Sequence, residues 1–257
     1  MDPATIIGLV VAFGAVLVSI FLEGASPMSV VLPAPMMLVI GGTLGAGLIG
    51  STLKDAIFAF SSLPKALMFK PPRTTDAVET LVGLADRARR EGLLALEDAA
   101  KDIDDDFLKS GLQGAIDGTD PEDLRGILED RVNTKRTRDK GAAKYFADMG
   151  GYAPTVGIIG TVVSLVHVLE NLNKPDELGH MIAAAFVATL WGLLTSNLVW
   201  LPLSARLKRA SELECGHMEL IVEGLMSVQA GANPRLVGER LRSLLPEEPA
   251  KKEKAAA

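Results

Sequence analysis

The chain has 257 residues, of which 48% are hydrophobic and 23% are charged, and its mean hydropathy is +0.28. This composition excludes a disordered chain, a collagen-like fibre and a small disulfide scaffold. A positive mean hydropathy beside an ordinary charged fraction requires apolar and charged residues to occupy separate segments. No Lys or Arg precedes Lys54, and Lys174 is the only one between Lys144 and Arg206. We therefore expect a membrane protein with two charged aqueous parts.

Four runs without Asp, Glu, Lys or Arg are long enough to cross a bilayer. They cover residues 3–22, 24–53, 149–169 and 178–205. Roughly 20 apolar residues of α-helix cross a hydrocarbon core of about 30 Å. The first run lacks the basic segment of a signal peptide, and a second run follows it at once, so we expect it to be retained. The sequence predicts an all-α membrane protein with four transmembrane helices.

The basic residues predict the orientation of these helices. Of the 26 Lys and Arg residues, Lys174 alone lies in the two short connections within the helix pairs. The positive-inside rule then places both termini and the long middle segment in the cytoplasm. The single cysteine, Cys215, excludes an intrachain disulfide.

Four segments follow from this topology. Residues 1–53 hold transmembrane helices one and two, and 54–150 form a helical cytoplasmic domain. Residues 151–205 hold helices three and four, and 206–257 form a helical cytoplasmic tail.

Within the middle segment, apolar residues at helical spacing predict helices over 76–90, 93–100 and 107–116. Asp120 followed by Pro121 is a helix start, and this helix continues through a basic stretch towards the third run. A basic stretch beside a membrane is typical of residues at the lipid headgroups, which we prefer to nucleic-acid binding.

After the fourth run, the pattern predicts a helix to about residue 229 and another that starts at Asn233-Pro234. The apolar stripe of this last helix consists of Leu236, Val237, Leu241, Leu244 and Leu245. We expect the residues from Pro246 onward to fray.

Small residues recur four apart in the second, third and fourth runs, which allows close helix–helix contact. They are Gly42, Ala46 and Gly50, then Gly157 and Thr161, then Ala184, Ala188, Gly192 and Ser196. The row of the second run favours packing within one subunit. The hydroxyls beside the other two rows favour a polar surface that faces a partner.

Two threonines are expected at the same depth. A rise of about 1.5 Å per residue places Thr161 about 15 Å along the third run and Thr189 about 12 Å along the antiparallel fourth run. Each hydroxyl can bond to a carbonyl three or four residues back. Alternatively, the two hydroxyls line a wet passage for a cation.

No carboxylate lies near the middle of any run. A chain that moves H⁺ or Na⁺ through lipid needs a titratable or ion-binding group in the core. If this chain conducts ions, another subunit must bring the acid. His167, near the outer edge, is expected to be solvated. The sequence has no P-loop and no HExxH or GxSxG motif, so we expect neither an enzyme nor ATP as the energy source.

Several stretches form a combined pattern that covers nearly the whole chain. The third run opens with GYAPTVGIIGT (151–161), the fourth contains ATLWG (188–192) and Pro202, and ADRARREGLLALE occupies 85–97. The Met-Asp-x-Ala-Thr start and Gly-x-Asn-Pro (231–234) add to it. Together these stretches resemble the MotA/PomA family, the A subunit of the bacterial flagellar stator, within the superfamily of ExbB and TolQ.

The resemblance implies a machine in the bacterial inner membrane that converts an ion gradient into rotation. In the family, five A subunits surround two B subunits, each with one membrane helix that carries the ion-binding aspartate. The cytoplasmic part of the A subunit engages a FliG-type rotor protein. The family uses H⁺ or Na⁺ and no cofactor or bound metal. An ExbB/TolQ-type energiser, which generally has three spans, and a membrane scaffold remain as alternatives.

The resemblance also assigns roles to individual residues. Thr161 and Thr189 match pore-facing hydroxyls, and Pro154 and Pro202 match prolines tied to coupling. Independently of the resemblance, we expect the small residues Gly157, Gly160, Ala188 and Gly192 of the third and fourth runs to be helix-packing residues. Arg89, Arg90 and Glu97 match charges that engage the rotor. Without the resemblance, these three charges would be read as an ordinary solvated helix face.

Overall fold

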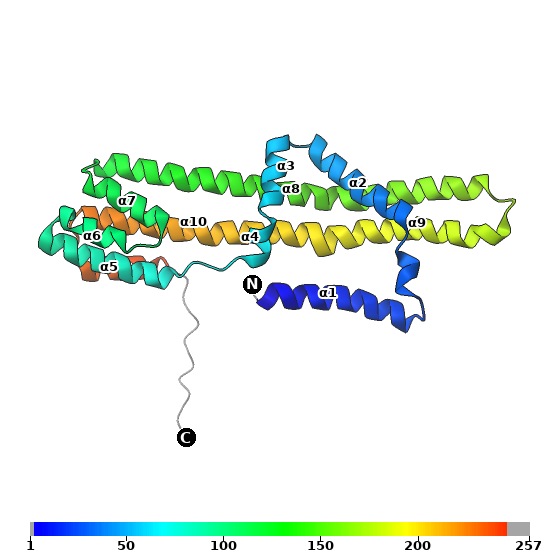
Figure 1. Ribbon diagram of the computed structural model, residues 1–257, viewed down its shortest axis with the longest axis horizontal. Coiled ribbons are helices and arrows are strands. Elements are labelled where there is room, and N and C mark those ends of the chain that lie inside the picture. The colour runs from blue at the N-terminus through cyan, green and yellow to red at the C-terminus, as the bar shows by residue number, and fades with distance from the viewer. Residues whose placement is uncertain (1–2, 246–257) are drawn as a thin grey trace, which may run out of the picture. The chain divides into compact units, whose positions relative to one another are not determined.

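The computed structural model describes residues 3–245, with side chains from residue 6 onward. This part of the chain is helical and contains no strand (Figure 1). It divides into two compact units. We call the described residues up to Lys70 together with Thr137–Ser211 the membrane unit. The charged unit consists of Pro71–Arg136 and the described residues from Glu212 onward.

Two long helical stretches run through both units. One is α8 (Pro121–Glu170). The other consists of α9 (Pro175–Thr195), the π-helix η3 (Ser196–Trp200) and α10 (Leu201–Gln229). Each contains an apolar window long enough to cross a bilayer, yet only 22% and 28% of these windows are buried. The core helix of a water-soluble protein would be mostly buried, so these helices require lipid or other chains around them.

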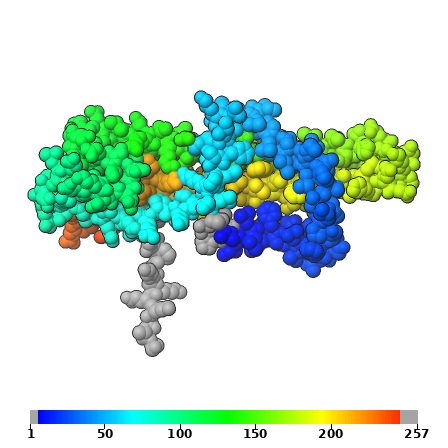
Figure 2. Space-filling view, in the orientation of Figure 1, coloured from blue at the N-terminus to red at the C-terminus, as the bar shows by residue number. Residues whose placement is uncertain are grey.

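The N-terminal part of the membrane unit supplies two further apolar helices, α1 (Pro3–Leu22) and α2 (Pro33–Ile49), joined through the short 3₁₀-helix η1 (Pro27–Val30). Figure 2 shows α1, in dark blue, at the surface, and most of its described apolar side chains are exposed. The shorter α3 (Leu53–Ser61) and α4 (Leu63–Met68) follow. The predicted all-α fold with four apolar helices is confirmed.

The second helix is shorter than the run that predicted it. Residues 24–53 form one uncharged run, but only Pro33–Ile49 is α-helical there. Pro27, Pro33 and Pro35 lack a backbone N–H, so each fits the first turn of a helix and interrupts a longer one. The uncharged run therefore contains a connection as well as a helix.

The buried face of α2 also differs from the predicted row. Pro35, Val39, Thr43 and Gly47 are buried, whereas Gly50 is exposed. A Cβ on Gly47 would lie 3.1 Å from Cγ of Met149, and one on Gly42 would lie 2.8 Å from Cγ1 of Val156. The prediction that this row packs within the subunit is thus correct for Gly42, but the fully buried glycine is Gly47, whereas Gly50 only touches Tyr152 at the edge of the contact.

An aromatic cluster holds α3, α8 and η3 together. Phe60 lies edge-on to Tyr145 and Phe146, and Phe146 stacks on Trp200 with ring centroids 6.2 Å apart. Such aromatic pairs add stability beyond the area that they bury. The predicted boundary between cytoplasmic domain and third helix was residue 150, yet Tyr145 and Phe146, which precede it, pack in the membrane unit. The predicted segment boundaries refer to a bilayer and stay predictions.

The charged unit has its own apolar core. It contains α5 (Thr74–Glu91), the 3₁₀-helix η2 (Leu93–Ala95), α6 (Leu96–Lys101), α7 (Asp106–Ile116) and α11 (Pro234–Ser243), with parts of α8 and α10. These helices agree with the predicted ones. The core is built mainly from leucines and isoleucine that are fully buried: Leu81, Leu96, Leu112, Leu128, Ile221, Leu225 and Leu241.

The predicted apolar stripe of α11 is partly wrong. Val237 and Leu241 are buried and Leu245 packs against the core, but Leu236 is 61% and Leu244 53% exposed. This helix packs on α5 along a narrow face centred on Gly238, whose Cβ position lies 3.3 Å from Cγ2 of Val82. Leu236 lies at the edge of this narrow face and Leu244 beyond the end of the helix, so both stay exposed. The predicted frayed tail from Pro246 lies outside the described residues.

A charged contact fixes the start of α7. Asp105 Oδ1 accepts hydrogen bonds from the backbone N–H groups of Phe107 and Leu108, each at 2.9 Å. His217 Nε2, on α10, donates to Asp105 Oδ2 at 3.1 Å. The hydrogen bond from His217, followed by those from the helix start, lowers the pKa of the Asp105 carboxyl below its ordinary value.

Candidate ion-pathway and coupling site

Thr161 on α8 and Thr189 on α9 lie side by side. Their Oγ1 atoms are 2.5 Å apart, and both side chains are half-buried. The depth estimate that placed them at the same level is therefore correct. Thr161 Oγ1 also lies within hydrogen-bond distance of two carbonyls, that of Gly157 at 3.2 Å and that of Ala185 at 3.1 Å. The pair is held in a fixed arrangement between the two helices.

These contacts bear on the two alternatives for the hydroxyls. Thr161 can bond to the carbonyl four residues back, as the first alternative expected, but it also contacts the neighbouring helix. The hydroxyls of the third and fourth rows thus bond within the chain, and the expectation that they also face a partner stays a prediction. The half-buried pair can still offer oxygen lone pairs to a passing cation, and its role in ion passage stays a prediction.

α8 and α9 come closest at Gly157 and Gly192, about one helical turn from the two threonines. A Cβ on Gly157 would lie 3.0 Å from the Ala188 carbonyl oxygen, and a Cβ on Gly192 would lie 2.8 Å from the Ala153 carbonyl oxygen. A Cβ on Gly160 would lie 2.8 Å from Cβ of Ala188. At Gly157 and Gly192 backbone faces backbone, so no flexible side chain can yield to a larger residue. Glycines at this crossing bring Thr161 and Thr189 within reach of each other.

Pro154 creates an unpaired acceptor in α8, and the structure supplies its donor. Proline has no N–H, so the carbonyl of Gly150, four residues back, loses its helical hydrogen bond. Ser196 Oγ, at the start of η3, donates to this carbonyl at 2.6 Å. Ser196 is 2% exposed. Sequence reasoning placed Ser196 in a small-residue row but missed this role.

Pro202 lies next to an irregular turn. It follows the π-helix Ser196–Trp200 in the first turn of α10. A proline there removes the hydrogen bond to Leu198, four residues back, and crowds its carbonyl, which favours a locally widened helix. Gly150 contacts this turn too, since its Cβ position lies 2.6 Å from Cδ2 of Leu201. The two prolines therefore lie on the two helices of one crossing. Gly150 contacts both Ser196 and Leu201 there.

The site contains no charged group of its own. Between Asp148 and His167, and between His180 and Arg206, the sequence has no Asp, Glu, Lys or Arg. His167 is exposed, with Nδ1 3.8 Å from Glu170 Oε2, at the end of the hairpin. Hydroxyls and carbonyls can coordinate Na⁺ or relay a proton, but they cannot bind H⁺ as a carboxylate does.

The predicted rotor-binding charges lie at one exposed corner of the charged unit. Arg89 and Arg90 occupy the last turn of α5, and Glu97 the first turn of α6. Gly92, with φ +85°, makes the sharp turn between them. Arg90 pairs with Asp86 at 3.0 Å, whereas no ion pair to Arg89 or Glu97 occurs among the described residues. This placement agrees with an interaction surface and with a solvated face alike.

An apolar side chain in this corner was missed. Leu94, in the turn between the charges, is 75% exposed. The sequence placed Leu94 within the helix expected over 93–100 and gave no sign of its exposure. Exposed apolar groups ringed by charges are typical of protein–protein contacts.

Comparison with known proteins decides the family. The model of the MotA/TolQ/ExbB proton channel family matches residues 99–220, and the model of the motility protein A N-terminal region matches residues 6–92. Motility protein A of Bacillus subtilis is 38% identical over 96% of this chain and 92% of its own length. This chain belongs to the motility protein A family. The resemblance found in the sequence is thus confirmed.

Two further relatives agree. Chemotaxis protein PomA of Vibrio alginolyticus is 32% identical over 96% of both chains. The structure of the flagellar MotAB stator complex from Bacillus subtilis contains a chain with a TM-score of 0.87 and 38% identity, covering 95% of this chain and 96% of that one. Membership in a family of multi-pass channel subunits of the inner membrane confirms that the chain is not an enzyme. The motility relatives and the stator structure support the stator interpretation over the ExbB/TolQ-type one.

Proposed function

We propose that this chain is the A subunit of a flagellar stator, which forms with a B subunit a channel for H⁺ or Na⁺ and converts ion flow into torque. One observation carries the proposal: the paired hydroxyls of Thr161 and Thr189 lie in apolar stretches, residues 149–169 and 178–205, that contain no carboxylate. An ion path through lipid needs such a group. A B-subunit aspartate beside the hydroxyl pair would complete the path, and no cofactor is needed.

The proposed assembly is a ring of A subunits, about five, around two B helices, with both termini and the charged unit in the cytoplasm. An exposed apolar face of α8 supports an assembly of several copies, because such a face needs covering. The face is formed by side chains that are 51–58% exposed in the single chain, namely Ile158, Ile159, Val162, Val163 and Val166. Lipid and neighbouring subunits would cover this surface.

The proposed mechanism starts at the partner's aspartate. Binding of H⁺ or Na⁺ neutralises a charge that is costly in lipid, which exchanges one set of helix contacts for another. The crossing at Gly157 and Gly192 is rigid, whereas the turns at Pro154 and Pro202 have lost helical hydrogen bonds. Those turns are where α8 and α10 can bend. The ring then steps around the B helices.

The corner around Gly92 is proposed to contact the rotor. Arg89, Arg90 and Glu97 would pair with charges on a FliG-type protein, and Leu94 would supply the apolar centre of the contact. Each step of the ring moves this corner past the rotor.

Two variants at one position test the pore. Thr189→Leu fills the space beside Thr161 with an apolar group and removes the hydroxyl, so we expect swimming to be lost while the A–B complex still assembles. Thr189→Ser keeps the hydroxyl and should retain most of the torque. Normal torque in the Thr189→Leu strain would refute the proposed pore position. Swimming speed with and without Na⁺ identifies the ion.

A further inference from the structure

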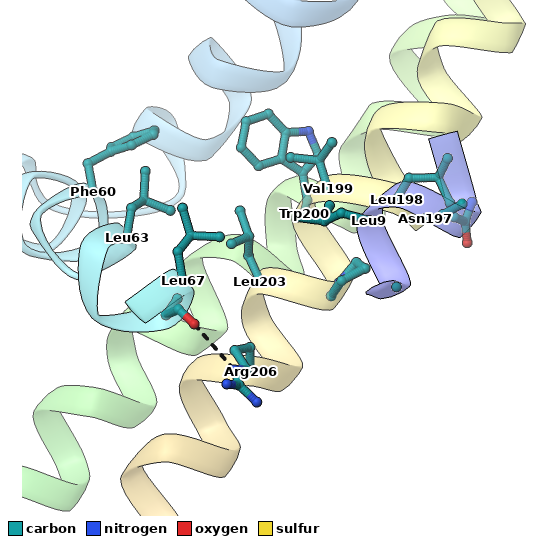
Figure 3. A pocket seen from close by; sticks show the side chains of 14 residues that line it. Leu9, Phe60, Leu63, Leu67, Asn197, Leu198, Val199, Trp200, Leu203 and Arg206 are labelled. Carbon is teal, nitrogen blue, oxygen red and sulfur yellow. Dashed lines mark hydrogen bonds between the residues drawn. The ribbon is translucent and has the colours of Figure 1, made fainter. Parts of the chain in front are cut away.

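An apolar cavity of about 700 Å³ opens in the membrane unit between α1, the α3–α4 segment and the start of α10 (Figure 3). Leu9 approaches from α1, Leu63 and Leu67 from α4, and Leu203 from α10. Its volume falls in the range of about 300–1,000 Å³ that is usual for ligand sites. On the α1 side, two of the three lining residues, Gly8 and Ala12, have small or no side chains, so they leave space beside the helix.

Water is a poor occupant of this cavity. Three lining residues have polar groups in their side chains, namely Asn197, Trp200 and Arg206. Asn197 Nδ2 already donates to the Leu193 carbonyl of its own helical stretch at 2.9 Å. Apolar cavities do not hold water, and an empty one forfeits the dispersion contacts of its lining. In a helix unit surrounded by lipid, hydrocarbon is the available filling.

The cavity has one charged end. Arg206 is the first charged residue after the uncharged run 178–205, so it lies where the apolar part of this helix stops. Its Nε donates to the Ala66 carbonyl at 3.3 Å, drawn as a dashed line in Figure 3, and its guanidinium lies 6.0 Å from the Phe69 ring centroid. These contacts hold the positive charge at the cavity instead of letting the side chain extend away.

One further basic residue lies near this end of the cavity. Lys70 is exposed and follows Phe69, whose ring lies beside the Arg206 guanidinium. Lys208, two residues after Arg206 in α10, is exposed on the opposite side of that helix. Lipid phosphates lie at this depth, and a guanidinium matches a phosphate group well. An exposed lysine nearby favours a headgroup with a net negative charge.

We propose that this cavity is a binding site for one anionic phospholipid, with an acyl chain between α1 and α10 and the phosphate at Arg206. The lipid would fill the gap that the small residues of α1 leave and would join α1 to the rest of the membrane unit. The proposal goes beyond the stator function and does not depend on it.

Native mass spectrometry of the purified, delipidated A–B complex tests the site with phosphatidylglycerol and phosphatidylcholine as probes. For the wild type we expect about fivefold tighter binding of phosphatidylglycerol, the effect of roughly one basic residue near a headgroup. Ala12→Trp fills the cavity and should lower the binding of both lipids about tenfold or more. Val18→Trp, on an exposed part of α1, is its matched control and should bind like the wild type.

The charge is tested separately. Arg206→Gln should keep phosphatidylcholine binding and abolish the preference for phosphatidylglycerol, whereas Lys208→Gln should keep most of it. Because Arg206→Gln leaves the cavity in place, it tests the proposal even if Ala12→Trp fails to assemble. Unchanged lipid binding in Ala12→Trp, or an unchanged preference in Arg206→Gln, overturns the proposal.

Two other occupants are distinguished directly. A photo-crosslinking residue at position 203 should yield an adduct with the mass of a phospholipid. A crosslink to a second copy of this chain would assign the cavity to a neighbouring helix and overturn the proposal. Excess inorganic phosphate should not displace phosphatidylglycerol, and displacement would show that a free phosphate, not a lipid, is the ligand.

Discussion

The hydrogen bond from Ser196 to the Gly150 carbonyl should be coupled energetically to Pro154. Ser196→Ala leaves this buried carbonyl without a donor, because residue 154 has no N–H to offer. An unpaired buried acceptor costs about 1–3 kcal/mol in water-soluble proteins, and hydrogen bonds between membrane helices are worth about 0.6 kcal/mol on average and up to about 1.7. We expect Ser196→Ala to lower the free energy of unfolding by about 1–2 kcal/mol.

The same substitution should cost much less when residue 154 is an alanine. In Pro154→Ala the new N–H can donate to the Gly150 carbonyl within α8, so the acceptor keeps a partner when the serine hydroxyl is gone. A double-mutant cycle should then give a coupling energy of about 1 kcal/mol between positions 154 and 196.

Equilibrium unfolding of the purified chain in mixed detergent micelles measures the four free energies. Thr195→Val is the matched control, because Thr195 Oγ1 donates to the Trp191 carbonyl of its own helix at 2.7 Å. Its cost should be the same with Pro154 and with Ala at that position. If the effects of Ser196→Ala and Pro154→Ala add to within about 0.5 kcal/mol, the proposed link between proline and serine is wrong.

Three further predictions concern other parts of the molecule. Gly192→Ala places a Cβ against the Ala153 carbonyl and should destabilise the chain by about 1–3 kcal/mol in the same unfolding assay, whereas Gly45→Ala, with open space at its Cβ position, should not. Arg89→Glu should reduce motor torque in tethered cells with no change in unfolding midpoint or membrane level, since Arg89 is exposed; unchanged torque would return this residue to an ordinary solvated face. Asp105 has a lowered pKa, so its carboxylate stabilises the fold above its ordinary pKa of 3.8 and this contribution disappears as the pH falls through the folded value. Asp105→Asn should thus unfold more easily than the wild type at pH 7, and the gap should close below pH 3.8; a gap that persists there would count against the charged contact.

Helix existence could be predicted from the sequence because it depends on local signals. The Asp120-Pro121 and Asn233-Pro234 starts became the starts of α8 and α11, and uncharged runs marked the apolar helices. Equal depth of Thr161 and Thr189 followed from the helical rise alone.

Which side of an apolar helix is buried could not be predicted in the same way. The second helix is apolar on all sides, so the sequence has no polar face to show which side is buried, and Gly47 was missed. The Ser196 link was missed for a different reason. Pro154 identifies Gly150 as an acceptor without a donor, but the donor lies 46 residues away and depends on how two helices meet. The exposure of Leu94 likewise depends on the turn at Gly92.

Ion flux through reconstituted vesicles tests the central claim most directly, namely that this chain builds an ion path but lacks its charged group. Vesicles containing the A subunit alone should show no cation flux above empty vesicles. Vesicles with the A–B complex, freed of any B-subunit plug, should conduct H⁺ or Na⁺, and replacement of the membrane-helix aspartate of the B subunit should abolish that flux. A steady cation current through the A subunit by itself would contradict the account.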